Sequence, residues 1–428
     1  MGRGLSWRPQ PDISTDEEGG DTVVKPLLQA AVRALTGILA PVLTGLMGIT
    51  LAAILVLAVP QAGRAEPAPP IRIGATVSLS GKYEEPSLMV RDAMKLWERQ
   101  VNQRGGLLDR PVQLILHDDQ SQPQRVRELY HQLLNQDKVD LVFSPYGTEL
   151  TLAASEVSEH YQNFMLAVSA SGEVIWQQGY KYICGIHAPA KRYMISFLDV
   201  MARQGLESVA IIYEDSPFTK AAAQGAREWA PRLGLKVNYF QVYHHSQSEF
   251  PLLVRKSLAT RADGLILCAY AKDSYAFLAL LKEAGARPRA LCLTIAPALP
   301  DFYQQAGSMA EGVFCPSQWE PDTRIPYPGT KEFIESFKNF ARRPPSYQAG
   351  TAYAACQILE KAITQTRSLD QKKLRDFVQT MDTVTVVGRF RVDHTGMQVG
   401  HVPILIQWQQ GKKEIVYPRS MQTAAPKF

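Results

Sequence analysis

Residues 71–106 read IRIGATVSLSGKYEEPSLMVRDAMKLWERQVNQRGG, and this stretch decides the fold class. Its first part alternates apolar and other side chains, which predicts a β-strand. Its second part repeats apolar residues at helical spacing until the closing Gly-Gly pair, which predicts a helix and its end. The apolar positions are Ile71, Ile73, Ala75 and Val77 in the strand and Met89, Ala93, Leu96, Trp97 and Val101 in the helix. A strand followed by a helix is the unit from which parallel sheets are built.

The strand-helix unit recurs along the chain in two sets. Further strands of the first set are predicted at residues 111–119, 140–147 and 164–171, with helices at 125–138 and 151–161. The second set begins near residue 205, with predicted strands at 208–216, 236–244, 264–270 and 290–296 and helices between them. Later predicted helices, at about 330–341, at 348–366 and from Gln371, suggest a return to the first set. Such alternation specifies parallel sheets covered by helices.

The composition excludes several classes of protein. A formal net charge of +5 over 428 residues is too dilute for the concentrated basic face that binds nucleic acid, so no nucleic-acid partner is expected. The five cysteines are far apart and form no CxxC pair, which argues against a zinc site and against a disulfide framework. The sequence contains no HExxH, GxSxG or Walker A motif, and no cofactor is expected.

The N-terminal part predicts how the protein is sorted. The run from Ala34 to Val59 has no charged residue and is long enough to cross a bilayer. Gly63 and Ala65 then form a small-x-small cleavage pattern, which indicates an export signal. The segment before the run is long and includes Asp12, Asp16, Glu17, Glu18 and Asp21, unlike the short basic start of a usual signal, so retention as a membrane anchor is the alternative. Residues 1–65 are therefore a signal or anchor segment, and the rest of the chain is expected outside the cytoplasm.

The rest of the chain is longer than one hydrophobic core usually organises, so two lobes are expected. Parallel strands present loops and helix N-termini at their carboxyl ends. Two lobes that face each other at those ends form a cleft for a small molecule. The polar loops that follow the predicted strands are therefore the candidate binding residues.

Short motifs at the ends of these elements carry a resemblance to a known family. They are LSG at 79–81, NQRGG at 102–106, HDDQSQP at 117–123, SPYGT at 144–148, SAS at 169–171, YEDSPF at 213–218, APALPDF at 296–302, SQWEP at 317–321 and GRFRVDHTG at 388–396. With these motifs in this order and spacing, the chain resembles the periplasmic leucine/isoleucine/valine-binding family over roughly residues 70 to 415. Members of this family are type I periplasmic binding proteins of ABC importers.

The resemblance implies an α/β, two-lobed type I periplasmic-binding-protein fold, in which each lobe is a mainly parallel sheet with helices on both faces. Three crossover segments join the lobes, near residues 187–192, 313–319 and 386–394. Lobe 1 would comprise residues 71–187 and 319–386, and lobe 2 residues 192–313 and 394–418. The resemblance also implies a periplasmic, non-catalytic monomer that closes on a small-molecule solute and presents it to an ABC permease in the inner membrane.

The binding site follows from the same resemblance. Thr148 stands where the family holds the carboxylate of an amino acid with a hydroxyl group and backbone N–H groups. Backbone N–H groups at the start of a helix bind anions, which agrees with this role. The alternative is that Thr148 is simply the cap of a helix beginning near Glu149. The implied ligand-binding residues, several of which could equally be turn or packing residues, are Ser80, Tyr83, Tyr146, Thr148, Ser169, Ala170, Ser171, Phe218, Tyr270 and Ala296.

One position departs from the pattern of the family. Ile295 stands where amino-acid-binding members have an acidic residue that pairs with the ammonium group. Losing one partner of a buried ion pair costs about 2 to 5 kcal/mol, so a zwitterion would bind poorly unless a nearby acid substitutes. The candidate substitutes are Glu84, Glu85 and Asp215. Two kinds of ligand stay open: an amino acid, and a carboxylate without an amino group that the surrounding aromatic residues would suit if it carried a ring.

Other polar clusters are better explained without chemistry. Asp118 and Asp119 are adjacent on a predicted strand and point to opposite faces, so they do not form a catalytic pair. His244 and His245 have no further ligand at metal spacing, so no metal site is expected. A hydrolase needs a base beside its nucleophile, and only His187 falls near a candidate serine, so catalysis is not expected. A membrane-anchored sensor domain without catalytic activity is the alternative function.

Overall fold

The computed structural model describes residues 68–244 and 247–428, and residues 68–428 form one compact unit. The predicted signal or anchor segment, residues 1–65, lies outside the described residues. Within the described part, none of the helices combines the length and the apolar character that a membrane span requires.

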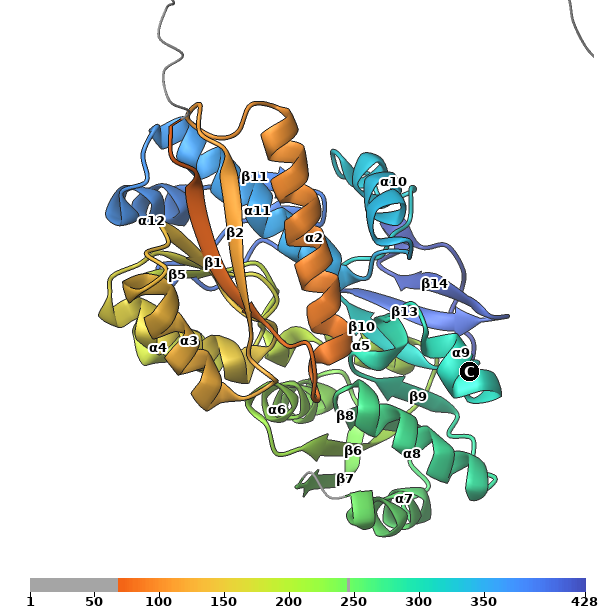
Figure 1. Ribbon diagram of the computed structural model, residues 1–428. Coiled ribbons are helices and arrows are strands. Elements are labelled where there is room, and N and C mark those ends of the chain that lie inside the picture. Colours follow the sequence, from red (N-terminus) through yellow and green to blue (C-terminus); the bar gives the residue numbers. More distant parts are fainter. Residues whose placement is uncertain (1–67, 245–246) are drawn as a thin grey trace, which may run out of the picture. The chain divides into compact units, whose positions relative to one another are not determined.

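The first sheet is parallel throughout and forms the centre of lobe 1 (Figure 1). Its strand order is β2-β1-β3-β4-β5, with β1 at Ile71–Val77, β2 at Val112–Asp118, β3 at Leu141–Phe143, β4 at Met165–Ala167 and β5 at Ile183–Gly185. The strand predicted at the start of the fold-deciding stretch is confirmed, and its Ile71 and Ile73 are fully buried. Because β1 lies inside the sheet, both of its faces need a cover.

Helices cover both faces of this sheet. α2 (Glu84–Gln103) leads from β1 to β2, and α3 (Pro123–Asn135) leads from β2 back across to β3. Since the chain moves in opposite directions across the sheet, right-handed crossovers put these two helices on opposite faces. α2 packs against α11 (Tyr347–Thr366), and α3 packs against α4 (Thr148–His160). α10 (Thr330–Ala341) packs on α2 and α12 (Gln371–Thr380) on α11, so the chain returns to lobe 1 late in the sequence.

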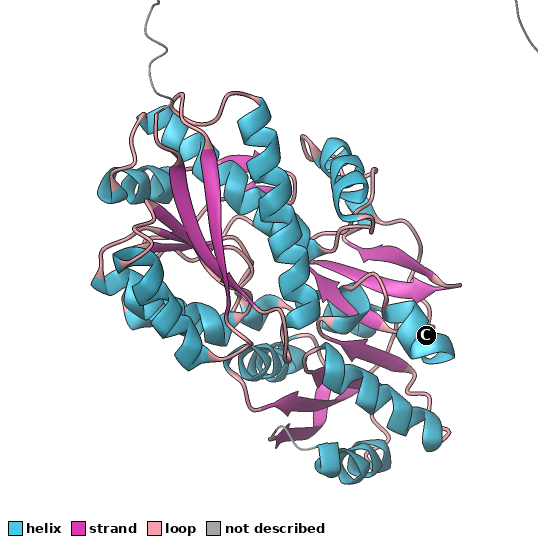
Figure 2. Cartoon of the chain, in the orientation of Figure 1, coloured by secondary structure: helices cyan, strands magenta, loops and turns pink. Residues whose placement is uncertain are grey.

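The second sheet forms the centre of lobe 2 and has the order β14-β13-β10-β9-β8-β6-β7. Its pairs are parallel except those of β10 with β13 and of β13 with β14, which are antiparallel. The strands are β6 (Ser208–Glu214), β7 (Lys236–Tyr243), β8 (Gly264–Cys268), β9 (Ala290–Leu293), β10 (Phe314–Ser317), β13 (Ile404–Gln409) and β14 (Lys412–Tyr417). The helices around this sheet (Figure 2) are α5 (Ile195–Arg203), α6 (Pro217–Arg232), α7 (Phe250–Ala259), α8 (Ala271–Glu283) and α9 (Phe302–Ala306).

Shorter elements complete the chain. β11 (Thr383–Thr385) and β12 (Gly388–Phe390) form a separate antiparallel pair. Short 3₁₀ helices lie at η1 (Glu173–Gln178), η2 (Ala190–Arg192), η3 (Gln247–Glu249), η4 (Ala296–Ala298), η5 (Gly307–Ala310) and η6 (Arg419–Met421). Several predicted boundaries differ by a few residues. α4 begins at Thr148 rather than at residue 151, and β3 is shorter than the predicted strand at 140–147. α3 ends at Asn135 rather than at residue 138, and Lys138 has a left-handed φ of 49° that a helix does not continue.

The chain passes between the two sheets three times, after β5, after β10 and after β12. The predicted arrangement of two mainly parallel, helix-covered sheets is therefore confirmed. The carboxyl ends of strands from both sheets meet, since Lys82, just after β1, lies 3.1 Å from Glu214, the last residue of β6. The loops at these strand ends lie where the two lobes face each other.

Candidate binding site between the lobes

A small cavity lies where the two lobes meet. Its lining residues are Tyr146, Gly147, Thr148, Ser169, Ala170, Ser171, His187, Tyr193, Phe218, Tyr270, Ile295 and Tyr347. The space open to the centre of a water molecule is about 10 Å³, which is roughly what one water needs, so the lobes are tightly closed here. The structure thus brings together these predicted ligand-binding residues: Tyr146, Thr148, Ser169, Ala170, Ser171, Phe218 and Tyr270.

Two loops of lobe 1 form one wall of the cavity. Gly147, after β3, has a left-handed φ of 86°, which glycine adopts without strain. Its N–H donates a hydrogen bond to the carbonyl of Ser169, after β4, so the two loops are fixed to each other at 3.0 Å. α4 begins directly after Gly147, and its first N–H groups have no acceptor within the helix. This wall therefore presents backbone donors at the cavity.

The cap predicted at Thr148 is wrong. Gly147 occupies the N-cap position of α4, and Thr148 is the first residue of the helix. The Thr148 hydroxyl oxygen instead accepts a hydrogen bond from the N–H of Gly172, at 3.0 Å. A threonine inside the first turn cannot reach back to cap that turn, so its side chain joins α4 to the loop after β4.

A buried histidine connects the hydroxyl groups of the cavity. His187 Nε2 lies 3.2 Å from the Ser169 hydroxyl and 2.9 Å from that of Thr351, while Nδ1 lies 3.1 Å from the Ser171 hydroxyl. The Ser171 hydroxyl in turn lies 2.7 Å from that of Tyr193. Burial, together with the charge of nearby His401, lowers the pKa of His187 to about 3, so this ring is neutral at physiological pH.

The pH dependence of stability should report this neutral histidine. Between pH 6.5 and about 3, His187 is protonated in the unfolded chain but neutral in the folded protein. The stability that neutral His187 contributes is therefore fully present above pH 6.5 and is lost progressively as the pH falls toward 3. We expect His187→Gln to reduce the slope of unfolding free energy against pH, between pH 6 and 4, by about 1.4 kcal/mol per pH unit. Urea unfolding at several pH values measures this slope, and an unchanged slope would show that His187 is not buried neutral.

Aromatic and apolar side chains of lobe 2 form the opposite wall. The Phe218 ring, at the start of α6, lies 5.2 Å from the ring of Tyr193 and 5.9 Å from that of Tyr270. Ile295 follows β9 with a φ of 60° and a ψ of −69°, in a tight turn in which the Ala296 N–H donates to the Thr294 carbonyl at 2.7 Å. A β-branched residue rarely adopts this conformation, and strained backbone of this kind is common at ligand sites.

Three predicted residues lie outside the cavity lining. Ser80 is exposed, and its carbonyl accepts a hydrogen bond from the Ser121 hydroxyl at 2.7 Å. Ala296 is fully buried, next to Ile295. Tyr83 packs just behind the lining, with its ring 4.9 Å from that of Tyr270.

No charged side chain lines this cavity within the described residues. The three acids considered as substitutes for the missing counter-charge are absent from the lining as well. Glu84 is exposed, and Asp215 lies 3.6 Å from Lys220. Burial, and then the charge of Asp301, raise the pKa of Glu85 to about 7. The cavity is therefore a polar but uncharged space with several aromatic walls.

Sequence reasoning missed the charged residues nearest the cavity. Lys82, Glu149 and Glu214 lie together there, with Lys82 Nζ 3.1 Å from Glu214 and 3.8 Å from Glu149. They come from three distant stretches of the chain: folding of lobe 1 brings Lys82 near Glu149, and closure of the lobes adds Glu214. Lysine and glutamate are common surface residues, and no sequence motif contains all three, so nothing in the sequence indicated that they would meet.

The other polar clusters have structural roles. Asp119 is fully buried and accepts hydrogen bonds from the Thr76 and Ser78 hydroxyls, at 2.8 and 2.5 Å. His244 lies 3.5 Å from Asp215, and His245 lies outside the described residues. Across residues 68–244 and 247–428, no group of three or more metal-ligating side chains is present.

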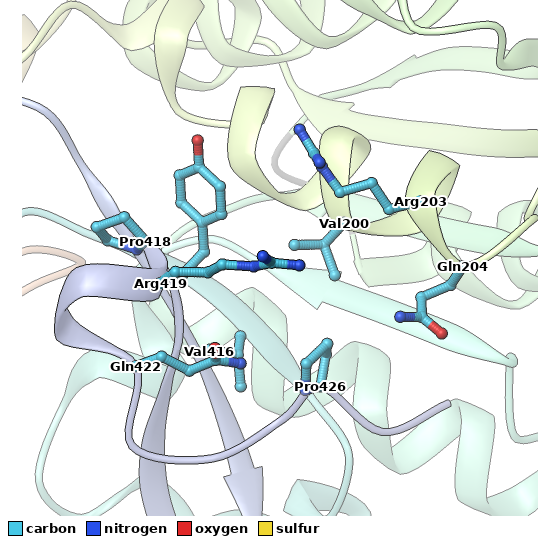
Figure 3. A pocket seen from close by; sticks show the side chains of 9 residues that line it. Val200, Arg203, Gln204, Val416, Pro418, Arg419, Gln422 and Pro426 are labelled. Atoms are coloured by element: carbon cyan, nitrogen blue, oxygen red, sulfur yellow. The ribbon is translucent and has the colours of Figure 1, made fainter.

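A larger groove of about 690 Å³ lies on lobe 2, between α5 and the segment that follows β14 (Figure 3). It is lined by Val200, Arg203, Gln204, Val416, Tyr417, Pro418, Arg419, Gln422 and Pro426. All of these residues belong to lobe 2, so a molecule bound there would not contact both lobes. The smaller cavity between the lobes is therefore the candidate site.

The fold and this cavity define a class of protein: two α/β lobes, joined by three segments of chain, with a small cavity between them. A family model described as periplasmic binding protein matches residues 70–413. The chain belongs to this family, and it is similar in sequence and in its type I fold to leucine/isoleucine/valine-binding proteins. These are non-catalytic substrate-binding proteins of ABC transporters.

Individual relatives are distant in sequence but similar along their whole length. Leu/Ile/Val-binding protein homolog 7 of Brucella abortus (strain 2308) is 23% identical over 381 residues, which cover 84% of this chain and 94% of that protein. The isoleucine complex of LivJ, a branched-chain amino acid transporter substrate-binding protein of Streptococcus pneumoniae, has a TM-score of 0.72 and 18% identity, covering 82% of this chain and 100% of that chain. A solute-binding protein of an ABC transporter from Rhodopseudomonas palustris BisB5, in complex with 3,4-dihydroxy benzoic acid, has a TM-score of 0.70 and 18% identity, covering 80% and 94%. At these identities the structural likeness shows the fold.

Proposed function

We propose that this protein is the solute-binding protein of an ABC importer and that its solute is a small organic carboxylate without an ammonium group, with aromatic acids as the first candidates. The observation that carries the proposal is the cavity between the lobes, whose described lining combines hydroxyl groups, backbone donors and aromatic rings without a charged side chain. Membership of a periplasmic binding family implies that the protein works outside the cytoplasm.

The lining favours a carboxylate over a zwitterion. A carboxylate accepts hydrogen bonds from the free N–H groups at the start of α4 and from the hydroxyl groups of Ser169 and Ser171. An ammonium group needs a counter-charge, but the apolar side chain of Ile295 lines the cavity where the resemblance leads us to expect an acid. Leaving a buried charge unpaired costs about 2 to 5 kcal/mol, which is a loss of about 30-fold or more in affinity.

The rings of the cavity favour an aromatic solute. Tyr146, Tyr193, Phe218, Tyr270 and Tyr347 all line it. Rings of this kind pack on one another edge-to-face or offset, so a flat solute ring would add to an arrangement that already exists. The solved relatives support both kinds of ligand for this fold, since one holds isoleucine and another holds 3,4-dihydroxy benzoic acid.

Uptake of a solute requires motion of the lobes. The closed cavity has room for about one water, so a ring can enter only when the lobes separate. With the ring bound, the lobes close around it less tightly than in this structure, and the solute stabilises that closed form because it contacts both lobes at once. We propose that the closed, monomeric protein presents its solute to a membrane permease after export directed by residues 1–65, and that the residues which hold the solute are those of the cavity lining together with Tyr83.

Equilibrium titration tests the proposed solute. We expect benzoate or 3,4-dihydroxybenzoate to bind the purified protein with a Kd in the micromolar range or tighter, and leucine to bind at least about 30-fold more weakly. Isothermal titration calorimetry measures both affinities. Nanomolar to low-micromolar binding of leucine would contradict the proposal, and native mass spectrometry of gently purified protein would identify a different co-purified solute directly.

A further inference from the structure

Five side chains beside the cavity tie the two lobes together. Lys82, in the loop between β1 and α2 of lobe 1, places its Nζ 3.1 Å from Oε1 of Glu214 in lobe 2. The same Nζ lies 3.8 Å from Oε2 of Glu149, and it lies over the rings of Tyr83 and Tyr270, 4.9 and 5.1 Å from their centroids. We call these five residues the latch cluster. It joins an ammonium group of lobe 1 to a carboxylate and an aromatic face of lobe 2.

Of the two ion pairs in the latch cluster, the one between Lys82 and Glu214 spans the lobes and needs them closed. The Glu214 side chain is 2% exposed and that of Lys82 is 27% exposed. A carboxylate buried to this degree is costly without a cationic or hydrogen-bonding partner, which Lys82 supplies across the lobe boundary. When the lobes separate, both groups regain water and the pair is lost, so it favours the closed form. This contribution to closure needs no charge on the solute.

The latch cluster lies directly behind the cavity wall. The Tyr270 ring lines the cavity and also lies under Lys82 Nζ. A methyl group added at Gly147, another lining residue, would lie 3.8 Å from Tyr83 Cε1 and 3.9 Å from the Tyr270 hydroxyl. One layer of side chains therefore separates the Lys82 ammonium from the cavity. Glu214 and Glu149 balance the charge of Lys82, so the cluster acts on the site through the closed position of the Tyr270 ring rather than through a net positive charge.

We propose that Lys82 is a built-in ammonium group that latches the lobes in the closed form and so raises the affinity of the site for its solute. This inference rests on the proposed function and names a residue that stabilises the closed form. Lys82 does not line the cavity, so the latch acts without touching the solute.

The latching role can be measured without any solute. Spin labels on cysteines introduced at Glu128 of α3 and Lys256 of α7, both exposed, report the distance between the lobes by double electron–electron resonance. The five native cysteines are buried, so they do not compete for the label. We expect Lys82→Ala to shift the distance distribution toward open lobes. Propylammonium replaces the atoms from Cγ to Nζ that this change removes, and we expect it to restore the closed distance, whereas 1-propanol at the same concentration and ionic strength does not.

The effect of the latch on affinity is measured by titration of a second variant. Lys82→Met keeps the length of the side chain and removes its charge, and we expect it to weaken benzoate binding by about tenfold because the closed form loses its ion pair between the lobes. Lys372→Met is the matched control, since Lys372 is an exposed lysine that pairs with Asp376 at 2.6 Å within one helix of lobe 1. We expect this control to match the wild type in lobe distance and in benzoate affinity.

Each outcome decides the inference separately from the proposed function. If propylammonium acts no differently from propanol on Lys82→Ala, Lys82 is not a latch. If Lys82→Met binds benzoate as tightly as Lys372→Met does, closure by Lys82 does not contribute to the affinity for the solute. The proposed function fails in a different way, when wild-type protein binds leucine tightly and benzoate not at all. Even then, the distance between the lobes of Lys82→Ala, measured with and without propylammonium, would decide whether Lys82 is a latch.

Discussion

Replacing Tyr270 by alanine is expected to weaken binding of the solute by about 100-fold, the largest effect of any single change in the cavity. This side chain lines the cavity, packs 4.9 Å from the Tyr83 ring, and lies under Lys82 Nζ. Its removal takes away a cavity wall and part of the latch cluster together. Because the contacts it makes are those of the closed form, the loss should appear mainly as a faster dissociation rate. Stopped-flow and calorimetric measurements with benzoate check this.

Two variants show whether the effect belongs to the cavity. Tyr270→Phe keeps the ring that lines the cavity and lies under Lys82, so we expect only a few-fold loss of affinity. Arg227→Ala alters the outer face of α6, where Arg227 lies over the Phe240 ring at 4.4 Å, and it should leave binding unchanged. If Arg227→Ala and Tyr270→Ala weakened binding equally, the site would not be at this cavity.

The fold was predictable because its signals are local. The alternation of Ile71 and Ile73 and the helical spacing from Met89 to Val101 each depend on a short stretch of chain, and both became the expected strand and helix. The polar loops at the ends of the strands were predictable for the same reason, since parallel strands of one sheet put their carboxyl ends at one edge. Sequence position therefore sufficed to bring Thr148 and Ser169 together at the cavity.

The charged residues beside the cavity were not predictable in this way. Lys82 and Glu214 stand 132 positions apart and meet only when one lobe closes on the other. The acids predicted as possible counter-charges, among them Asp215, are instead close in sequence to the predicted loops. Asp215 pairs with Lys220 at 3.6 Å, whereas its neighbour Glu214 is buried beside Lys82. On a strand, adjacent side chains point to opposite faces, so a shift of one residue decides which carboxylate faces the other lobe.

Gly396, in the last crossover, is a position where even a methyl group is expected to destabilise the fold. Gly396 follows β12, and its carbonyl accepts a hydrogen bond from the N–H of Gly185, the last residue of β5, at 2.8 Å. This bond ties the segment that leads back to lobe 2 to the point where the chain first leaves lobe 1. Gly396 has a left-handed φ of 88°, and a methyl group added to it would lie 2.1 Å from the carbonyl oxygen of Ile183. Two crossover segments therefore pack backbone against backbone.

Gly396→Ala is accordingly expected to lower the free energy of unfolding by about 3 kcal/mol, about 1 kcal/mol from the left-handed conformation and the rest from the forced separation of the two crossovers. Gly105→Ala is the matched control, because Gly105 has a φ of 97° but no atom within 4 Å of the added methyl group, and it should cost only about 1 kcal/mol. Urea unfolding of both variants measures the difference. Equal losses would mean that the crossovers can move apart freely, and then the hinge could not hold the two walls of the cavity in register.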